Sequence, residues 1–397
     1  MTTLQEPRDS AVPDLPLSAP VQAVVQRALA EQRLVGAVVL VARHGELIHR
    51  QAAGFADRES ARPMTLATLF RLASVSKPIV ATAALVLVAR GLLALDAPIA
   101  TWLPEFRPRL ADGSPATLTA RQLLSHTAGL GYRFLEADGE GPYARAGVSD
   151  GMDAAGITLA ENLRRLASVP LRYAPGSAWG YSLATDVLGA LIERIHGTPL
   201  AEAIRHLVTG PLGMTDTDFV ARDPRRLATP YVSDRPRPHP LVEGERVPVF
   251  EETVGIIYSP ARIFDAQAFP SGGAGMAGTA GDFLRLLETL RRGGEPLLPG
   301  ELVEELGRDQ TGGQELPGAP GFGFGLLGSV LRDPSLAVSP ESPGTWRWGG
   351  AYGHSWFVDR EQGLSVVAFT NTLYEGMSGR FVTELRDAVY ASLESGL

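Results

Sequence analysis

An uninterrupted apolar segment, residues 79–89, follows directly on a serine and a lysine that lie three residues apart. The segment is rich in Ala and Leu, is longer than most β-strands and stops before Gly91, so it predicts a helix buried on nearly all sides. It is too short to span a membrane. Pro78 suits a first helical turn, where its missing N–H would have no partner, so the helix is expected to begin near Ser74.

Ser74 and Lys77 are expected to face the same way, because residues i and i+3 of a helix lie about 5–6 Å apart at Cβ. A free serine hydroxyl is a poor nucleophile at neutral pH and needs an adjacent base. A lysine can be that base if burial or a nearby cation lowers its pKa, and the positive end of a helix dipole helps to stabilise an oxyanion. The other interpretation is that Ser74 caps the helix while Lys77 extends to solvent, so the motif needs partners elsewhere.

Composition excludes several classes of protein. With 397 residues, 45% hydrophobic and 20% charged, the chain is an ordinary globular one, long enough for a large core or two domains. The formal net charge of −8 argues against a nucleic acid or an anionic membrane as partner. The absence of cysteine rules out disulfides, thiol nucleophiles and Cys-ligated metal. The seven histidines have no ligand spacing, so neither a metal nor another cofactor is expected.

The first twenty residues are polar and have no apolar core. They contain Glu6, Arg8, Asp9 and Asp14, so no signal peptide is predicted and a cytoplasmic location is the expectation.

The first half of the chain predicts strands followed by helices. We expect a helix over residues 20–33, with a β-hairpin from residues 35–42 and 47–53 after it. The stretch from 92 to 222 contains helical segments broken by Gly and Pro; the expected helices cover residues 119–124, 186–195 and 200–208.

The second half predicts a return to mixed structure. Six prolines within residues 223–248 predict an exposed, extended loop. Thr279 is expected to cap a helix over residues 280–292. The remaining expected elements are strands over residues 322–331, 345–348, 355–359 and 364–371, and a last helix over residues 379–393.

Together these elements predict an α/β fold of the α+β kind, in which an antiparallel sheet is flanked by helices. Residues 1–78 and 250–397 are assigned to a discontinuous α/β domain and residues 79–249 to a mainly helical inserted domain. The active site is expected in the cleft between the two domains.

Tyr181 lies in a loop between the turn-forming residues 174–176 and a predicted helix. A phenol in this position could accept the proton of the serine if a neighbouring ammonium stabilised its anion, and could later donate a proton to the leaving group. The alternative is a packed aromatic ring with its hydroxyl at the surface.

The run Trp348-Gly349-Gly350 is a second candidate site. Glycines in a strand permit close approach of a ligand to the backbone, and an unpaired N–H there could supply half of an oxyanion hole. The alternative is a bulge at the edge of a sheet. His354 is interpreted as a structural hydrogen-bonding residue and not as a base.

Residues 147–151 satisfy G-x-S-x-G, the nucleophile elbow of α/β-hydrolases, with Ser149 at its centre. That motif requires a hydrophobic strand before it and a helix after it. Here loop residues precede it, so Ser149 is not expected to be catalytic.

The order of Ser74, Lys77, Tyr181 and the late glycine-bearing strand resembles that of serine β-lactamases and penicillin-binding proteins. Residues 124–130 and 211–214 also look like the class C branch of that superfamily. Within it, the chain is most similar to the bacterial family VIII carboxylesterases of the EstB type. The resemblance runs through the whole chain and implies a serine β-lactamase-like fold.

Two departures from the class C pattern indicate the substrate. Class C enzymes have Y-x-N where this chain has Tyr181-Ser182-Leu183, and K-T-G where it has Trp348-Gly349-Gly350. The Asn amide that meets the substrate amide and the Lys cation that meets the substrate carboxylate are therefore both replaced. An indole suits an uncharged, apolar acyl or alcohol group, so the resemblance implies ester hydrolysis.

The implied reaction is hydrolysis of short-chain or aryl esters, and of ester side chains of cephalosporins, through an acyl-enzyme on Ser74. Lys77, Tyr181 or the coupled pair acts as base, the backbone N–H groups of Ser74 and Ala351 hold the oxyanion, and Trp348 shapes the pocket. The alternatives are a β-lactamase or D-Ala-D-Ala peptidase, a noncatalytic penicillin sensor, and an acyltransferase or amidase. The expected partner is a small-molecule ester.

Overall fold

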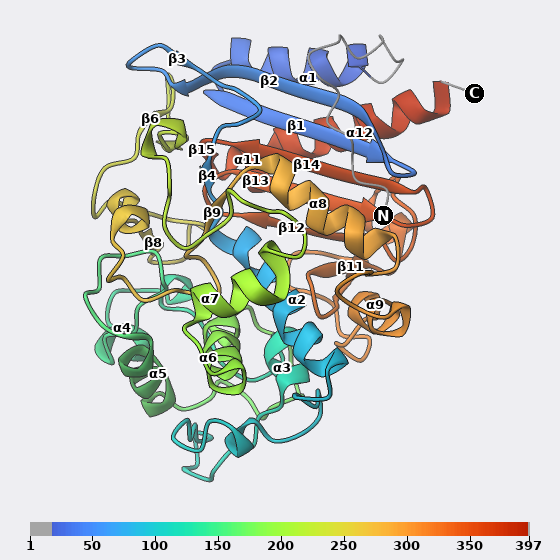
Figure 1. Cartoon of the computed structure of the whole chain (residues 1–397). Helices are drawn as coiled ribbons and strands as arrows, with labels where there is room; N and C mark the ends of the chain where they lie inside the picture. The colour runs from blue at the N-terminus through green and yellow to red at the C-terminus, as the bar shows by residue number, and fades with distance from the viewer. Residues whose placement is uncertain (1–17, 396–397) are drawn as a thin grey trace.

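The structure, a computed structural model, describes residues 18–395. The polar first twenty residues, from which a cytoplasmic location is expected, lie almost wholly outside the described residues. Its centre is one antiparallel sheet with the strand order β10-β11-β12-β13-β14-β1-β2-β3 (Figure 1). The strands are β1 (Gly36–Arg43), β2 (Glu46–Asp57), β3 (Arg62–Pro63), β10 (Phe322–Phe324), β11 (Ser329–Leu331), β12 (Trp346–Gly350), β13 (His354–Asp359) and β14 (Leu364–Thr370). The sheet thus joins strands from both ends of the chain, and its antiparallel character confirms the predicted fold class.

The sheet confirms most of the predicted strands and corrects one. β1 and β2 form the expected hairpin, and β12, β13 and β14 pair in sequence order. The single strand expected over residues 322–331 is wrong, because β10 and β11 are two paired strands. Between them the amide of Gly325 donates to the carbonyl of Gly328 at 2.8 Å. A Cβ at Gly325 would lie 2.5 Å from the carbonyl oxygen of Leu306, so only glycine fits this turn.

Helices cover both faces of the sheet. Helices α1 (Ser18–Ala30) and α12 (Arg380–Ser395) lie together on one face, and α8 (Ala280–Arg291) crosses the other (Figure 1). The core between the first pair and the sheet includes Val21, Val39 and Phe381, all fully buried. Thr279 caps α8 by accepting from the amide of Asp282, as expected from the sequence. The three helices confirm the expected elements, with ends displaced by up to three residues.

A second group of helices lies below the sheet in Figure 1. Its central member is α2 (Ser76–Ala89), which packs against α6 (Ala184–His196). Residues 76–87 of α2 are all buried, which confirms the prediction of a helix buried on nearly all sides. The others are α3 (Ala120–Leu124), α4 (Pro142–Arg145), α5 (Leu159–Ser168) and α7 (Leu200–Ile204), which continues as a π-helical turn over Arg205–Thr209. The division of the chain into two domains stays a prediction.

The proline-rich residues 223–248 are not the exposed loop that the sequence predicted. Tyr231 and Val232 form strand β5 (Tyr231–Val232), both are buried, and β5 pairs with β15 (Thr372–Leu373) and β6 (His239–Pro240). The hydroxyl of Tyr231 accepts a hydrogen bond from the amide of Arg58 at 2.8 Å. Proline removes only its own N–H, so short strands fit between prolines where the partners need few donors.

The remaining elements are short. They are β4 (Phe70–Arg71), β7 (Arg246–Val247), β8 (Ile256–Ile257), β9 (Ala277–Gly278), α9 (Gly300–Gly307), α10 (Pro334–Ala337) and α11 (Glu375–Ser378).

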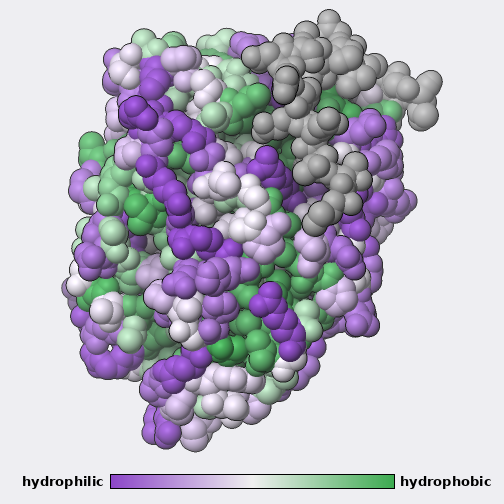
Figure 2. Space-filling model, in the orientation of Figure 1, coloured by the Kyte–Doolittle hydropathy of each residue, from purple (hydrophilic) through white to green (hydrophobic). Residues whose placement is uncertain are grey.

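The visible surface mixes hydrophilic and hydrophobic side chains, with hydrophilic groups widely spread over the face in Figure 2. Among the described residues, none of the helices is both long and apolar enough to cross a membrane.

Candidate active site

The nucleophile candidate sits on a strained turn. Strand β4 pairs with β9, and the chain then enters a 3-10 turn, Ala73–Val75, directly before α2. Ala73 has φ of 45°, in the left-handed region, which costs a non-glycine residue about 1 kcal/mol. The α-helix begins at Ser76, so Ser74 lies two residues before it, close to the start that the sequence predicted. Its side chain is part-buried and lines an open cleft.

The lysine turns inward to the serine. Lys77 is only 5% exposed, and its Nζ donates to Ser74 Oγ at 3.2 Å and to the carbonyl of Gly273 at 2.8 Å. The interpretation in which Lys77 extends to solvent is thus wrong. Val75, not Ser74, is the N-cap residue of α2, and it makes no side-chain cap. Ser74 is therefore not a helix cap and Lys77 is not a solvent-exposed side chain, which were the two parts of the alternative interpretation of the S-x-x-K motif.

The tyrosine completes a three-way contact. Tyr181 Oη donates to Ser74 Oγ at 2.7 Å, and Lys77 Nζ lies 4.7 Å from the centroid of the Tyr181 ring. The serine oxygen is therefore contacted by two proton-carrying groups that also contact each other. The phenol does not point to the surface, which was the alternative interpretation from the sequence.

A buried histidine supports the tyrosine from behind. The rings of His126 and Tyr181 lie 4.8 Å apart, and His126 Nδ1 is hydrogen-bonded to Ser182 Oγ at 3.1 Å. Burial, together with the positive charge of Lys77, holds the pKa of His126 well below its usual value, so the imidazole is neutral. It packs beside the reacting groups and presents no further charge to them.

Strand β12 forms the opposite wall. Its Trp348 stands over Tyr181 with ring centroids 5.2 Å apart, and Gly350 is so close to the serine turn that a Cβ would lie 2.5 Å from the carbonyl oxygen of Leu72. A Cβ at Gly349 would lie 2.7 Å from the carbonyl oxygen of His354. These glycines permit the strand end to approach the Ser74 turn, and they are part of a regular ladder with β13 and not a bulge.

Ala351 follows this strand at the edge of the cleft. Within residues 18–395 its amide has no hydrogen-bond acceptor. An unpaired N–H next to the serine turn is available to a developing oxyanion. His354 instead faces away: it is fully buried, and its Nε2 donates to the carbonyl of Arg71 at 2.8 Å, as a structural residue.

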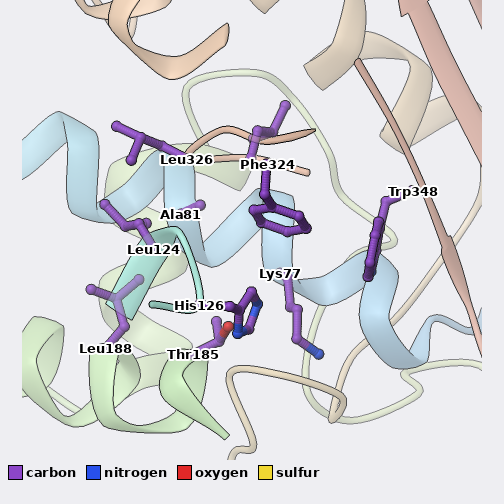
Figure 3. A pocket seen from close by; sticks show the side chains of 10 residues that line it. Lys77, Ala81, Leu124, His126, Thr185, Leu188, Phe324, Leu326 and Trp348 are labelled. Carbon is purple, nitrogen blue, oxygen red and sulfur yellow. The ribbon is translucent and has the colours of Figure 1, made fainter. Parts of the chain in front are cut away.

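Figure 3 shows how Lys77, His126, Phe324 and Trp348 converge from α2, a loop, β10 and β12. Between them lies a small cavity of about 10 Å³. The inner side of the lysine is thus bordered mainly by aromatic and aliphatic side chains, and its ammonium bonds to Ser74 and to the carbonyl of Gly273.

The cleft in front of Ser74 has a volume of about 640 Å³, a size suited to a small organic ligand. Eight aromatic side chains contribute to its lining: Tyr132, Phe134, Tyr173, Trp179, Tyr181, Phe250, Phe322 and Trp348. Asp150, Arg172 and Arg347 also line it, so the aromatic part of the wall favours uncharged, apolar groups while a few charged groups lie among them.

The G-x-S-x-G loop has a structural position. Ser149 is 1% exposed, and its hydroxyl donates to Asp153 while it accepts from the amide of Gly151 at 3.1 Å. Asp150 accepts from the amides of Arg133 and Phe134, and burial raises the pKa of its carboxyl to about 7. The motif therefore anchors a loop that borders the cleft, and its serine is not exposed to a substrate.

The sequence does not predict the two supporting residues, His126 and Gly273. His126 lies within residues 124–130, which resemble the class C branch, and Gly273 lies in a glycine-rich run. Neither pattern indicates a contact with Tyr181 or Lys77. Such contacts join residues far apart in the chain, so local spacing carries no signal for them.

Known proteins similar to this chain share its family and its fold. Residues 21–391 match the Beta-lactamase family model. The chain is 57% identical over 377 residues to Esterase EstB of Burkholderia gladioli, covering 94% of this chain and 95% of that protein. It superposes on EstCE1, described as a hydrolase with promiscuous acyltransferase activity, with a TM-score of 0.93, 47% identity and 94% and 98% coverage. Simvastatin synthase LovD of Aspergillus terreus, at 22% identity, has a TM-score of 0.74 over 95% of this chain and 100% of its own, and shares the fold alone.

Proposed function

The chain belongs to the beta-lactamase family, and from this membership we propose that it is a serine carboxylesterase. Its substrates are short-chain or aryl esters, including cephalosporins that carry an ester side chain. The relative at 57% identity is an esterase, which supports ester hydrolysis over lactam opening. The cytoplasmic location expected from the sequence stays a prediction.

The single observation that carries the proposal is the three-way contact at Ser74 Oγ, which has Tyr181 Oη at 2.7 Å and Lys77 Nζ at 3.2 Å. A serine placed in this way can lose its proton as it attacks, because Tyr181 or Lys77, once deprotonated, accepts that proton across the same short contact. Lys77 and Tyr181 form a coupled pair, and an ammonium beside a phenol stabilises the negative charge that the phenol acquires.

The proposed reaction has two half-reactions. In the first, Ser74 Oγ forms a bond to the ester carbonyl carbon while its proton passes to the Tyr181–Lys77 pair. The amides of Ser74 and Ala351 hold the oxyanion. The bond from carbon to the alcohol oxygen then breaks, and the pair returns the proton to the departing alcohol. In the second half-reaction, water attacks the acyl carbon by the same proton route, and Ser74 Oγ leaves and is reprotonated.

Trp348, Gly349 and Gly350 are proposed to form the substrate-binding strand. The glycines leave room beside the backbone, and the indole offers an apolar surface where class C enzymes carry a lysine. A substrate with an uncharged acyl group fits this wall better than one with a carboxylate.

The test compares the protein with its Ser74→Ala variant on p-nitrophenyl butyrate and on the lactam nitrocefin. We expect fast ester turnover and slow or absent lactam opening, with both activities lowered about 10⁴-fold or more in the variant. Circular dichroism of the variant should match the parent. Preferential lactam opening, or a folded Ser74→Ala variant that keeps its esterase activity, would contradict the proposal.

Acyl transfer to an alcohol is the second candidate. EstCE1, at 47% identity, is described as having promiscuous acyltransferase activity, and the aromatic cleft favours an apolar alcohol over water. The test adds benzyl alcohol to the ester assay and measures benzyl butyrate against butyrate. Formation of butyrate alone at every concentration of the alcohol would exclude this side activity.

A further inference from the structure

A carboxylate lies buried behind the lysine. Asp186 is in the first turn of α6 and is fully buried. Its Oδ1 accepts from Ser271 Oγ and from the amide of Gly273, both at 2.8 Å. Its Oδ2 has no hydrogen-bond partner among residues 18–395. A carboxylate that is fully buried with one oxygen unpartnered is costly for a fold to keep.

One residue, Gly273, separates this carboxylate from Lys77. The amide of Gly273 donates to Asp186, and the carbonyl of the same residue accepts from Lys77 Nζ at 2.8 Å. A Cβ at Gly273 would lie 3.4 Å from Lys77 Nζ and 3.5 Å from Asp186 Oδ1. The glycine thus leaves open a position that a negative and a positive group both border.

The hydrogen bonds alone do not require a charge. Asn would supply the same acceptor oxygen to Ser271 and Gly273 without burying an anion. The charge of Asp186 therefore needs another explanation, and the cation nearest to it through the bonded network is the ammonium of Lys77.

Arg262 and Tyr132 also face Asp186. Arg262, on the 3-10 turn Pro260–Phe264, is also positive, but its guanidinium donates to the carbonyls of Asp153 and Phe269. Tyr132 is buried, and burial, together with the Tyr181 hydroxyl and the charge of Asp186, raises the pKa of its phenol, so it stays neutral. Burial raises the pKa of Asp186 itself, while its hydrogen bonds from Gly273 and Ser271 and the charges of Lys77 and Arg262 oppose the rise.

We propose that Asp186 is a positioning residue that acts through the backbone N–H and C=O of Gly273 to hold Lys77 as an ammonium against Ser74. In this arrangement Lys77 works as a fixed cation that stabilises negative charge on Tyr181 and on the oxyanion. Tyr181, as the phenolate beside this cation, is then the group that takes the proton of Ser74 and becomes the neutral phenol. The inference rests on the proposed esterase function and assigns different roles to the two members of its catalytic pair.

The test is Asp186→Asn, which keeps the volume and the acceptor oxygen and removes the charge. We expect kcat for p-nitrophenyl butyrate to fall about tenfold, with KM nearly unchanged. We also expect the alkaline limb of the pH profile of kcat/KM to move to lower pH by about one unit, because an ammonium without its counter-charge loses its proton more readily. The free energy of unfolding should stay the same or rise.

Glu193→Gln is the matched control. Glu193 is a part-buried carboxylate on the same helix, accepts from the amide of Leu200 at 2.7 Å, and also has its pKa raised by burial. It lines a different pocket, so its variant should keep the parent's kcat and pH profile.

Three results would overturn the inference. The first is an Asp186→Asn variant with the kcat and pH profile of the parent, which would make Asp186 a structural acceptor. The second is a variant with higher kcat, which would mean that Lys77 works as the neutral base. The third is a loss of unfolding free energy in Asp186→Asn larger than that in Glu193→Gln, which would mean that the charge of Asp186 stabilises the fold. Each is distinct from failure of the proposed function, in which the parent itself lacks Ser74-dependent esterase activity.

Discussion

The indole Nε1 of Trp348 lies 3.3 Å from the hydroxyl oxygen of Tyr181 and donates a long hydrogen bond to it. Trp348 is thus more than an apolar wall, because it touches the same phenol that contacts Ser74. Trp348 of β12, the proposed substrate-binding strand, and Tyr181, just before α6, thus share a hydrogen bond beside Ser74.

Trp348→Phe should separate the apolar contact of Trp348 from its hydrogen bond to Tyr181. It keeps most of the apolar surface and removes the N–H donor, so kcat for p-nitrophenyl butyrate should fall about fivefold, the value of one ordinary hydrogen bond, with KM little changed. Trp348→Ala should in addition raise KM about tenfold through lost apolar contact. Steady-state kinetics of both variants measure the split, and an unchanged kcat in Trp348→Phe would show that the hydrogen bond has no role in turnover.

Ser149→Ala should leave catalysis intact. Ser149 is buried, and among the described residues its hydroxyl bonds only within its own loop, to Asp153 and Gly151. The variant should therefore keep kcat within about twofold and lose about 1 kcal/mol of unfolding free energy, as expected for a buried hydrogen bond. Urea unfolding and esterase assays check the two parts. A correctly folded Ser149→Ala variant without activity would overturn the assignment of Ser74.

Gly350→Ala should damage the site through the backbone. Its Cβ would lie 2.5 Å from the carbonyl oxygen of Leu72, so β12 must move away from the Ser74 turn and carry the Ala351 amide with it. We expect kcat to fall about 100-fold, the typical cost of losing one oxyanion donor.

Gly281→Ala is the matched control for this variant. Gly281 lies in α8, and the nearest atom to its Cβ would be Thr279 Oγ1 at 3.9 Å. Alanine should be accepted there without loss of activity and with a small gain in helix stability. Full activity in Gly350→Ala would show that the strand end does not need to approach the turn so closely.

Stability should fall on the acid side because of His354. Burial lowers the pKa of this imidazole to about 4, while the unfolded chain titrates near 6.5. Between these values the unfolded state binds more protons, so the free energy of unfolding decreases as pH falls from about 6.5 towards 4, by about 3 kcal/mol from this residue. Nδ1 has no hydrogen-bond partner among the described residues, and burial outweighs the backbone contacts with Arg71 and Gly353 that favour the protonated ring.

His354→Gln isolates this contribution. Its amide can donate to the carbonyl of Arg71, as Nε2 does, but it does not titrate. Urea unfolding at several pH values between 7.5 and 4.5 should give a flatter curve for the variant than for the parent. Asp150, whose raised pKa favours the folded state at low pH, affects both proteins equally and cancels in the difference. Parallel curves would contradict the assignment.

The sequence by itself determined the features that depend on neighbouring residues. Pro78 and the apolar residues after it specify a buried helix, the Thr279 hydroxyl specifies a cap, and the strand-forming segments of residues 345–371, the last two joined by the turn at residues 360–363, specify three strands. A spacing of three residues was also enough to bring Lys77 to Ser74, because both belong to one turn of backbone.

Only the tertiary structure decided which distant groups meet. Tyr181 is 107 residues from Ser74, Gly273 is 196 from Lys77, and Asp186 reaches the site only through that glycine. The burial of residues 231–232 depends in the same way on a strand at the other end of the chain. Local propensity describes the conformation of a segment, whereas these contacts follow from how the sheet and α6 pack around α2. Packing depends on all residues of the core together, so the proximity of the Asp186 and Lys77 charges is determined only by the folded chain.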